Sequence, residues 1–382
     1  MPNFQFRLPI RDDLTRLQRL AIDDDKPIFT TGVPGSGKTV VAIYRIARLK
    51  NRSRLFTYTR MLTVAINGSV NEHLRDASNR VSSVYEWFAR NCNLRLTDYI
   101  ESKELLTEKL IDYNISFSEL IFDEAQDLPI TLYNAFKEIC NNISIGADNA
   151  QKVFLGSTEE DLRKIFCLNN PHELDENHRN TYEIFNFARH FVPENERAQN
   201  ANMLQLLNLK RRGDKPTIFT FKNIHDIFET FKDIIKDNIG GNIGVLLLHT
   251  NEVKTYYNII RNELKFDCSY YYSGMPTSDR DSVERNLKSI LVTTFKSAKG
   301  MEFDTVIIPE LQMIDDEFKT QYFVGCTRAR GNLFLFSKNS LPHFIESNFI
   351  EDSYTLETIS TKTLPINPIE MDNIIDLDDL PF

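Results

Sequence analysis

The sequence predicts an α/β protein with two parallel-sheet domains and an acidic, extended C-terminal tail. Three observations support this fold class. Short apolar runs alternate with helix-length segments in the first part of the chain, the alternation restarts at residue 217 after a mostly helical stretch, and it ends near residue 345. A chain of 382 residues is also too long for one ordinary hydrophobic core. We expect a first domain over residues 1–172, a second over 173–345 and a tail over 346–382.

The expected strands are short apolar runs separated by helix-length segments, a pattern that is typical of parallel sheets covered by helices. In the first domain these runs are residues 28–30, 55–58, 120–122 and 143–145. In the second domain they are residues 217–221, 243–248, 290–294, 306–308 and 333–336. The tail has no such pattern and contains Pro365, Pro368 and Pro381, so we expect it to be extended.

Charge and cysteine content limit the class of protein. The net charge is −9, but residues from Glu346 onward contribute −8 of it, which leaves a nearly neutral body that can still hold a basic groove. The five cysteines are scattered without the spacing of a metal site, which favours free thiols in a reducing cytoplasm. No apolar run of about 18 residues occurs, so we expect a cytoplasmic protein without a membrane span.

A glycine-rich loop follows the first expected strand and opens a helix-length segment. The loop reads Gly32-Val33-Pro34-Gly35-Ser36-Gly37-Lys38-Thr39. Backbone N–H groups at such a helix N-terminus cradle phosphates, whereas an isolated match to the pattern can also be an ordinary surface loop. We expect Lys38 to reach the β- and γ-phosphates of a nucleotide and the Thr39 hydroxyl to bind Mg²⁺.

Two acids end the strand expected at residues 120–122. Asp123 suits a ligand of Mg²⁺, and Glu124 suits the carboxylate that polarises an attacking water. A lone pair of acids is more often a solvated strand end. The glycine-rich loop about 80 residues upstream favours the catalytic interpretation, because together the two motifs supply phosphate binding and hydrolysis.

These two motifs resemble those of UvrD/Rep-type superfamily 1 helicases. The run Asp123-Glu124-Ala125-Gln126-Asp127 is similar to the family's second motif, and the other motifs follow in the family's order over roughly residues 14–336. The resemblance implies two tandem RecA-like domains of the P-loop NTPase type, which bind ATP and Mg²⁺ between them. It also implies ATP-driven movement on single-stranded DNA in the 3′-to-5′ direction, and RNA remains an alternative strand.

The resemblance extends to individual residues of the nucleotide site. Gln18 is similar to the adenine-reading glutamine, Gln151 to the glutamine that senses the γ-phosphate, and Glu302 to the glutamate that reads the ribose. Arg179 and Arg328 are similar to two arginines that reach the γ-phosphate from the second domain. A guanidinium suits this role because its fork matches the oxygens of the transferred phosphoryl group. The expected catalytic set is Lys38, Glu124, Gln151, Arg179 and Arg328.

Other motifs imply contacts to a nucleic-acid strand. Residues 55–60 resemble the family's strand and loop that contact single-stranded DNA, and residues 84–88 resemble a short aromatic motif. The expected contact residues are Thr57, Tyr58, Arg60, Trp87 and Lys296. Aromatic rings can stack on bases, but burial in the core is an equal alternative for them. Lys296 stands where the family has histidine, and it can bind a backbone phosphate.

The chain also departs from the larger family members. About 30 residues separate Phe88 from Leu120 and about 40 separate Leu248 from Leu291, so neither gap holds an accessory domain. The third motif lacks the family's tryptophan, with Phe154 as either a substitute or a core residue. We therefore expect a minimal helicase or translocase. The rival is an ATP-gated sensor or assembly subunit that binds nucleic acid and signals to a partner without processive unwinding.

The last residues of the tail, Asp376-Leu377-Asp378-Asp379-Leu380-Pro381-Phe382, look like the acidic tip of bacterial single-stranded DNA-binding proteins. The resemblance implies capture by a protein that recognises such tips, with the terminal ring in an apolar pocket and the carboxylate on a basic residue. The expected partner-binding residues are Asp378, Asp379, Pro381 and Phe382. The alternatives are a solubilising tail or a segment that lies in the protein's own basic groove.

Overall fold

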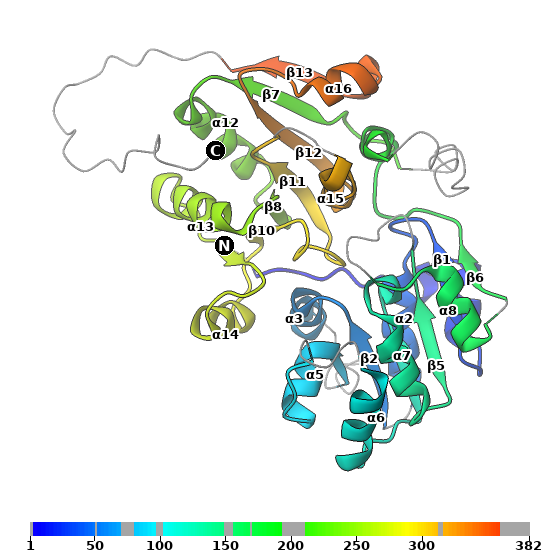
Figure 1. Cartoon of the computed structure of the whole chain (residues 1–382). Helices are drawn as coiled ribbons and strands as arrows, with labels where there is room; N and C mark the ends of the chain where they lie inside the picture. Colours follow the sequence, from blue (N-terminus) through cyan, green and yellow to red (C-terminus); the bar gives the residue numbers. More distant parts are fainter. Residues whose placement is uncertain are drawn as a thin grey trace.

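The computed structural model of the chain describes residues 3–49, 52–69, 80–96, 102–148, 156–168, 170–192, 211–311 and 316–359 (Figure 1). These residues form two α/β domains, each built on a sheet in which the paired strands run parallel. The expected fold class of two α/β domains with parallel sheets is confirmed, and residues 360–382 of the expected tail lie outside the described residues. No helix of the described ranges is long and apolar enough to cross a membrane.

The first sheet has the strand order β3-β2-β4-β5-β1-β6. Its strands are β1 (Phe29–Gly32), β2 (Ser53–Thr57), β3 (Val81–Ser83), β4 (Glu119–Phe122), β5 (Ile143–Gly146) and β6 (His172–Leu174). Its helical elements are η1 (Arg11–Asp13), α1 (Arg16–Asp23), α2 (Lys38–Arg48), α3 (Arg60–Ser69), α5 (Val84–Asn91), α6 (Lys103–Asp112), η4 (Ala125–Asp127), α7 (Ile130–Lys137) and α8 (Glu159–Phe166). Because β1 and β4 both flank β5, the segments that follow these three strands meet at one edge of the sheet.

The second sheet has the strand order β13-β7-β12-β11-β8-β10-β9. Its strands are β7 (Thr217–Phe221), β8 (Ile243–Leu247), β9 (Ser269–Tyr271), β10 (Ile290–Thr294), β11 (Phe303–Ile308), β12 (Ala329–Lys338) and β13 (Thr355–Thr358). Its helical elements are α9 (Tyr182–Ala188), η6 (Arg189–Phe191), η8 (Ile224–Asp226), α12 (Ile227–Asp237), α13 (Thr250–Asn258), η9 (Ile259–Glu263), α14 (Thr277–Arg285), α15 (Asp316–Cys326), α16 (His343–Asn348) and η10 (Glu351–Ser353).

Each strand expected from the sequence is present, and β3, β6, β9 and β13 are additional. The additional strands are short, with three or four residues each, and lie at the ends of the two sheets. β6 begins at His172, so the expected boundary at residue 172 falls inside a strand of the first sheet.

The ends of the described chain both pack on the second domain. Phe4 packs edge-to-face on Phe303 at 5.7 Å, and Arg7 pairs with Asp304 at 2.9 Å, although the sequence places both N-terminal residues in the first domain. At the other end, residues 346–359 were expected in the tail, but they complete α16 and form η10 and the edge strand β13, which pairs with β7. Phe349 explains this difference, because its buried ring packs 5.0 Å from those of Phe187 and Phe191.

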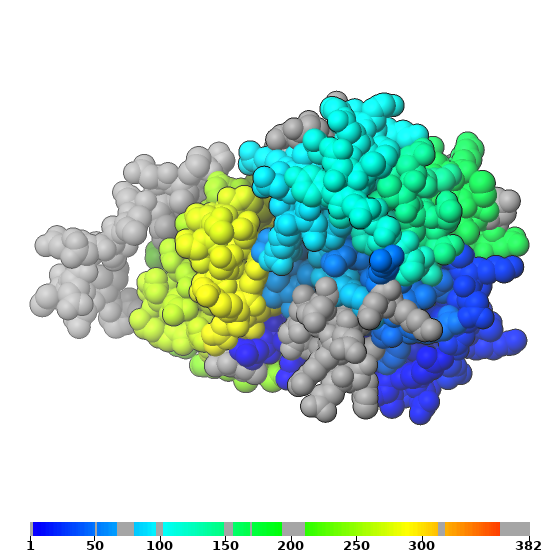
Figure 2. Space-filling view, turned by 90° about the horizontal axis from the view of Figure 1, so that it is seen from below, coloured from blue at the N-terminus to red at the C-terminus, as the bar shows by residue number. Residues whose placement is uncertain are grey.

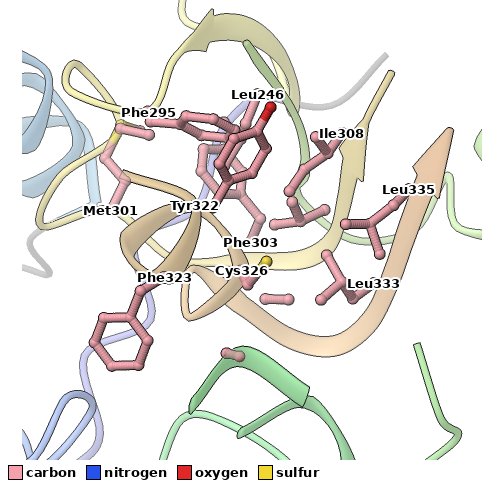
Figure 3. Packing of buried hydrophobic residues seen from close by; sticks show 14 of the residues in the cluster. Leu246, Phe295, Met301, Phe303, Ile308, Tyr322, Phe323, Cys326, Leu333 and Leu335 are labelled. Carbon is pink, nitrogen blue, oxygen red and sulfur yellow. The ribbon is translucent and has the colours of Figure 1, made fainter. Parts of the chain in front are cut away.

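The loop between β10 and β11, residues 295–302, is fixed in the core of the second domain. Phe295 and Met301, near its two ends, are both buried. Figure 3 shows the ring of Phe295 beside that of Tyr322 on α15, and the two rings lie 5.2 Å apart. Both ends of the 295–302 loop are therefore fixed in the core of the second domain, and the loop faces the first domain.

Candidate nucleotide and nucleic-acid site

The glycine-rich loop connects β1 to α2, as the sequence predicts. Gly37 precedes the first residue of α2 with a φ of 90°, and a Cβ on it would lie 2.4 Å from Gln18 Nε2. Gly35 has a φ of 77°, and a Cβ there would lie 2.6 Å from Asn177 Oδ1. Both positions combine a left-handed backbone with a close approach, so only glycine fits without strain. The loop is consequently a narrow cradle between α1 and the segment after β6.

The Lys38 ammonium is held inside this cradle. It donates to the carbonyls of Gly32 at 2.7 Å and Val33 at 3.1 Å, and lies 3.3 Å from the carboxylate of Asp148, which follows β5. Gln18 is part of the same cradle, because its Nε2 donates to the Ser36 carbonyl at 2.9 Å. A phosphate in the loop would draw the ammonium away from the two carbonyls, since the charged acceptor is the stronger one.

Thr39 and Asp123 come together from α2 and the end of β4. The Thr39 hydroxyl donates to Asp123 Oδ2 at 2.7 Å. The pKa of Asp123 is raised to about 7, because the carboxyl is buried and lies beside the charge of Glu124. Gly146, the last residue of β5, packs closely beside this pair: a Cβ on it would lie 3.1 Å from Thr30 Oγ1 and 3.6 Å from Asp123 Oδ1.

This pair fits Mg²⁺. One carboxylate and one hydroxyl are hard oxygen ligands, and Mg²⁺ is usually bound by one or two carboxylates together with water and substrate phosphates. Within the described ranges no group of three or more histidine, cysteine or acidic side chains forms a closed protein cage for a metal. A divalent cation between Thr39 and Asp123 would also favour the ionised form of the buried carboxyl.

Glu124 is held at the start of η4 in a backbone conformation that side chains rarely adopt. Its φ is 55°, and Gln126 Nε2 donates to its Oε2 at 2.6 Å. Burial by itself would raise the pKa of Glu124, but the positive charges of Lys299, Arg328 and Lys38 hold it below its ordinary value. Glu124 is therefore a buried carboxylate that stays ionised at neutral pH. That state is the one required of a group that accepts a proton from water.

The second domain contributes two arginines to the candidate site, Arg179 and Arg328. Arg179 follows β6 and is 8% exposed; its Nε donates to Glu302 Oε1 at 2.7 Å. Arg330 also pairs with Glu302, at 2.6 Å. Burial opposes ionisation of this carboxyl, but the two arginines hold the pKa of Glu302 at about 2. In this structure Glu302 thus orients Arg179, and its expected contact with a ribose stays a prediction.

Arg328 follows α15 and is completely buried. Its Nε donates to the Val324 carbonyl at 3.0 Å. Burial, and then the like charge of Arg179, lower the pKa of Arg328 to about 9, whereas the charges of Glu124 and Asp148 act in the opposite direction. The guanidinium of Arg328 is therefore within electrostatic reach of acids from the first domain. Arg179 lies against the glycine-rich loop, because a Cβ on Gly35 would come 2.7 Å from Arg179 Cβ.

The residues expected to contact a nucleic-acid strand differ in how exposed their side chains are. Lys296 is exposed on the 295–302 loop, and Tyr58 is half-buried, with its ring 6.3 Å from that of Tyr85. Thr57 is fully buried and its hydroxyl bonds to Thr63 at 2.9 Å, so it supports the segment after β2 from inside.

Trp87 lies in the aromatic core of the first domain, and the structure does not place it on a binding surface. It is 3% exposed, and its ring is surrounded by Phe56 at 5.5 Å, Phe88 at 5.1 Å and Phe117 at 5.5 Å. Helix α5 turns this apolar side chain toward the sheet, which removes both ring faces from bases. Core burial, the alternative left open by the sequence, applies to this residue.

Arg60 pairs with acids from both domains. Its guanidinium donates to both carboxylate oxygens of Glu284 on α14, and the distance from Arg60 Nη2 to Glu284 Oε2 is 2.9 Å. The guanidinium also lies 3.5 Å from the carboxylate of Glu86 on α5. Figure 2 shows α14 (yellow) in contact with the first domain next to α3 and α5 (blue to cyan). A phosphate would have to replace Glu284 to reach Arg60.

Two contributors to the site were not expected as site residues from the sequence. Lys299, on the 295–302 loop, lies 2.5 Å from Asp127 and 3.7 Å from Glu124, and Asp148 contacts Lys38. Both residues lie inside runs that resemble family motifs, which is the only signal the sequence offers for them. Gln151 and the partner-binding residues of the tail (Asp378, Asp379, Pro381 and Phe382) lie outside the described residues.

Comparison with known proteins identifies the fold. No protein-family model and no curated protein matches the sequence. The structure of S. cerevisiae Dbp5 bound to RNA and ADP BeF3 is 12% identical and covers 91% of this chain and 90% of that chain, with a TM-score of 0.53. A structure of a Dbp5 variant with the same ligands has the same identity and coverage and a TM-score of 0.54.

A third solved structure, the C-terminal domain of a possible DNA helicase from Lactobacillus plantarum, is 18% identical and covers 47% of this chain and 97% of that chain. Its TM-score of 0.36 is too low to support an argument. The two Dbp5 structures establish the fold alone, because their sequence identity is low. The chain shares their fold, two tandem RecA-like α/β domains.

Proposed function

We propose that this protein is an ATP-dependent superfamily 1 helicase or translocase, similar to the UvrD/Rep type, which moves on single-stranded DNA in the 3′-to-5′ direction. One observation carries the proposal. A phosphate cradle and two acids of the first domain lie beside Arg179 and Arg328 of the second domain: a Cβ on Gly35 in the cradle would come 2.7 Å from Arg179 Cβ, and the charges of Glu124 and Arg328 shift each other's pKa. A site divided between two domains makes their relative position depend on the nucleotide.

The residues supply the steps that ATP hydrolysis requires. The N–H groups of the glycine-rich loop and the Lys38 ammonium bind the phosphates, and Glu124 accepts a proton from the water that attacks the γ-phosphorus. The bond between that phosphorus and the bridging oxygen breaks, which leaves ADP and phosphate. Arg179 and Arg328 neutralise the charge that builds on the transferred group. A Mg²⁺ ion held by Thr39 and Asp123 would add positive charge at the phosphate oxygens.

The nucleic-acid strand is proposed to cross both domains beside α3 and the 295–302 loop. Tyr58 offers a half-buried ring, Lys296 an exposed ammonium, and Arg60 a guanidinium once Glu284 is displaced. Single-stranded DNA is the strand that the motif resemblance favours. The Dbp5 structures contain RNA, so RNA is the alternative to compare directly.

Steady-state ATP hydrolysis with and without a strand tests this function. We expect single-stranded DNA to stimulate turnover more than RNA does, and we expect the chain to displace streptavidin from the end of a biotinylated strand. Stimulation without displacement would support the rival function, an ATP-gated sensor or assembly subunit. The observation that favours this rival is that Arg60–Glu284 and Lys299–Asp127 ion pairs already join the domains around the proposed strand path.

A further inference from the structure

The side chain of Lys299 crosses from the second domain into the catalytic acids of the first. It is 0% exposed, and its ammonium lies 2.5 Å from Asp127 Oδ2 and 3.7 Å from Glu124 Oε2. A buried ammonium is costly unless acids compensate it. Both of these compensating acids belong to the first domain, so the placement of Lys299 depends on how the two domains sit against each other.

The backbone of Lys299 contacts the segment proposed to bind the strand. Its carbonyl accepts a hydrogen bond from the Thr59 hydroxyl at 2.9 Å, and Thr59 directly precedes α3. The next residue, Gly300, has a φ of 82°, and a Cβ there would lie 2.7 Å from Leu62 Cδ2 on α3. The 295–302 loop is thus seated closely on the first domain at this point.

The same loop carries Lys296, which is exposed and expected to bind a backbone phosphate. Lys299 N donates to the Lys296 carbonyl at 3.4 Å, so the two residues are joined by one turn. Phe295 and Met301 anchor the loop in the core of the second domain. A shift imposed at Lys296 by a strand would therefore move Lys299 rather than be absorbed by a flexible segment.

On the first domain, the acids that Lys299 contacts belong to a hydrogen-bonded group. Asp127 N donates to the Glu124 carbonyl at 3.0 Å, and Gln126 Nε2 donates to Glu124 Oε2 at 2.6 Å. Gln126 Oε1 in turn accepts from Asp148 N at 3.0 Å, and Asp148 contacts Lys38. Moving the ammonium would change the orientation of the Glu124 carboxylate relative to the phosphate cradle.

We propose that Lys299 is a positioning residue that couples strand binding to ATP hydrolysis, because its ammonium orients the Glu124 carboxylate when the 295–302 loop is seated on the first domain. This inference rests on the proposed function and adds a residue and a route to it. The strand acts at Lys296 and Thr59, and the effect reaches Glu124 through Lys299, without any contact between Lys299 and either ligand.

Two lysines on one loop supply the test. We would compare Lys299→Met with Lys296→Met, measuring kcat and KM for ATP hydrolysis across a range of single-stranded DNA concentrations and DNA affinity by fluorescence anisotropy. For Lys299→Met we expect the DNA-stimulated kcat to fall by roughly 10- to 100-fold, the cost of a misplaced catalytic group, with KM for ATP and DNA affinity nearly unchanged. For Lys296→Met, which removes a contact through which the strand acts, we expect a lower DNA-stimulated kcat together with weaker DNA binding, so DNA affinity distinguishes the two variants.

A double variant covers the case in which Lys299→Met does not fold because it leaves two buried acids without their cation. Lys299→Met/Asp127→Asn removes both charges of the closest pair, and the same loss of stimulated kcat is expected. The inference is overturned if the wild-type chain is stimulated by DNA and either Lys299 variant keeps that stimulated kcat. A wild-type chain that hydrolyses no ATP with any strand would instead overturn the proposed function, and the inference with it.

Discussion

Replacing Glu302 by glutamine should destabilise the second domain in a way that depends on pH. Glu302 accepts from Arg179 at 2.7 Å and pairs with Arg330 at 2.6 Å, and these contacts hold its pKa at about 2. A pKa that falls from 4.5 to about 2 corresponds to on the order of 3 kcal/mol, at about 1.4 kcal/mol for each tenfold change in an equilibrium constant. We therefore expect Glu302→Gln to lower the free energy of unfolding by up to that amount at pH 7.

The sign of the pH dependence follows from the direction of the shift. Because the folded protein has the lower pKa, the stabilisation is complete above about pH 4.5 and is lost as the pH falls from there toward 2. The difference between the wild type and Glu302→Gln should accordingly shrink by about half or more at pH 3. Urea unfolding followed by far-ultraviolet circular dichroism measures it.

The matched control is Glu263→Gln, which changes an exposed acid of the same domain. It should alter the free energy of unfolding by less than about 0.5 kcal/mol at either pH. A difference between the wild type and Glu302→Gln that is equally large at pH 7 and pH 3 would contradict the assignment of the stabilisation to the ionised carboxylate.

Three further predictions concern the strand and the tail. Glu284→Gln removes the charged partner of Arg60, and we expect single-stranded DNA to bind up to about fivefold more tightly in anisotropy titrations, because a partly exposed ion pair contributes up to about 1 kcal/mol. Weaker binding would argue against a phosphate site at Arg60. Tyr58→Ala should weaken DNA binding by about 1–3 kcal/mol, whereas Trp87→Ala should lower the free energy of unfolding by about 3–5 kcal/mol; the reverse pattern would refute the placement of the two rings. Deleting residues 376–382 should leave ATP hydrolysis intact and abolish capture by proteins that recognise acidic single-stranded DNA-binding-protein tips, and unchanged capture in a pull-down would refute that role.

The candidate nucleotide site could be proposed from the sequence because the residues that form it are grouped in short motifs. The glycine-rich loop and the pair Asp123 and Glu124 each follow an apolar strand, and parallel strands bring their carboxyl ends to one edge of a sheet. Arg179 and Arg328 could be proposed only through the family resemblance. Their distance along the chain from the glycine-rich loop gives no sign of a shared site.

Other features depend on packing that a linear pattern does not contain. An aromatic run such as residues 84–88 fits a stacking surface and a core equally well, and only the orientation of α5 places Trp87 inside. The acidic composition after Glu346 predicts a tail and gives no indication that Phe349 packs in the core or that the edge strand β13 forms. The pairing of β13 with β7 depends on contacts that are distant in sequence. The role proposed for Lys299 depends on two domains meeting, so its spacing within the motif carries no direct signal.

The central claim is that the two domains form one site in which Glu124 activates water for ATP hydrolysis. The most direct measurement is ATP turnover by the wild type and by Glu124→Gln at saturating single-stranded DNA, with binding of a non-hydrolysable ATP analogue as the control. The proposal predicts strand-stimulated turnover in the wild type and a loss of about 100-fold or more in Glu124→Gln, with analogue binding retained. Turnover that persists in Glu124→Gln, or wild-type turnover that no strand stimulates, would contradict it.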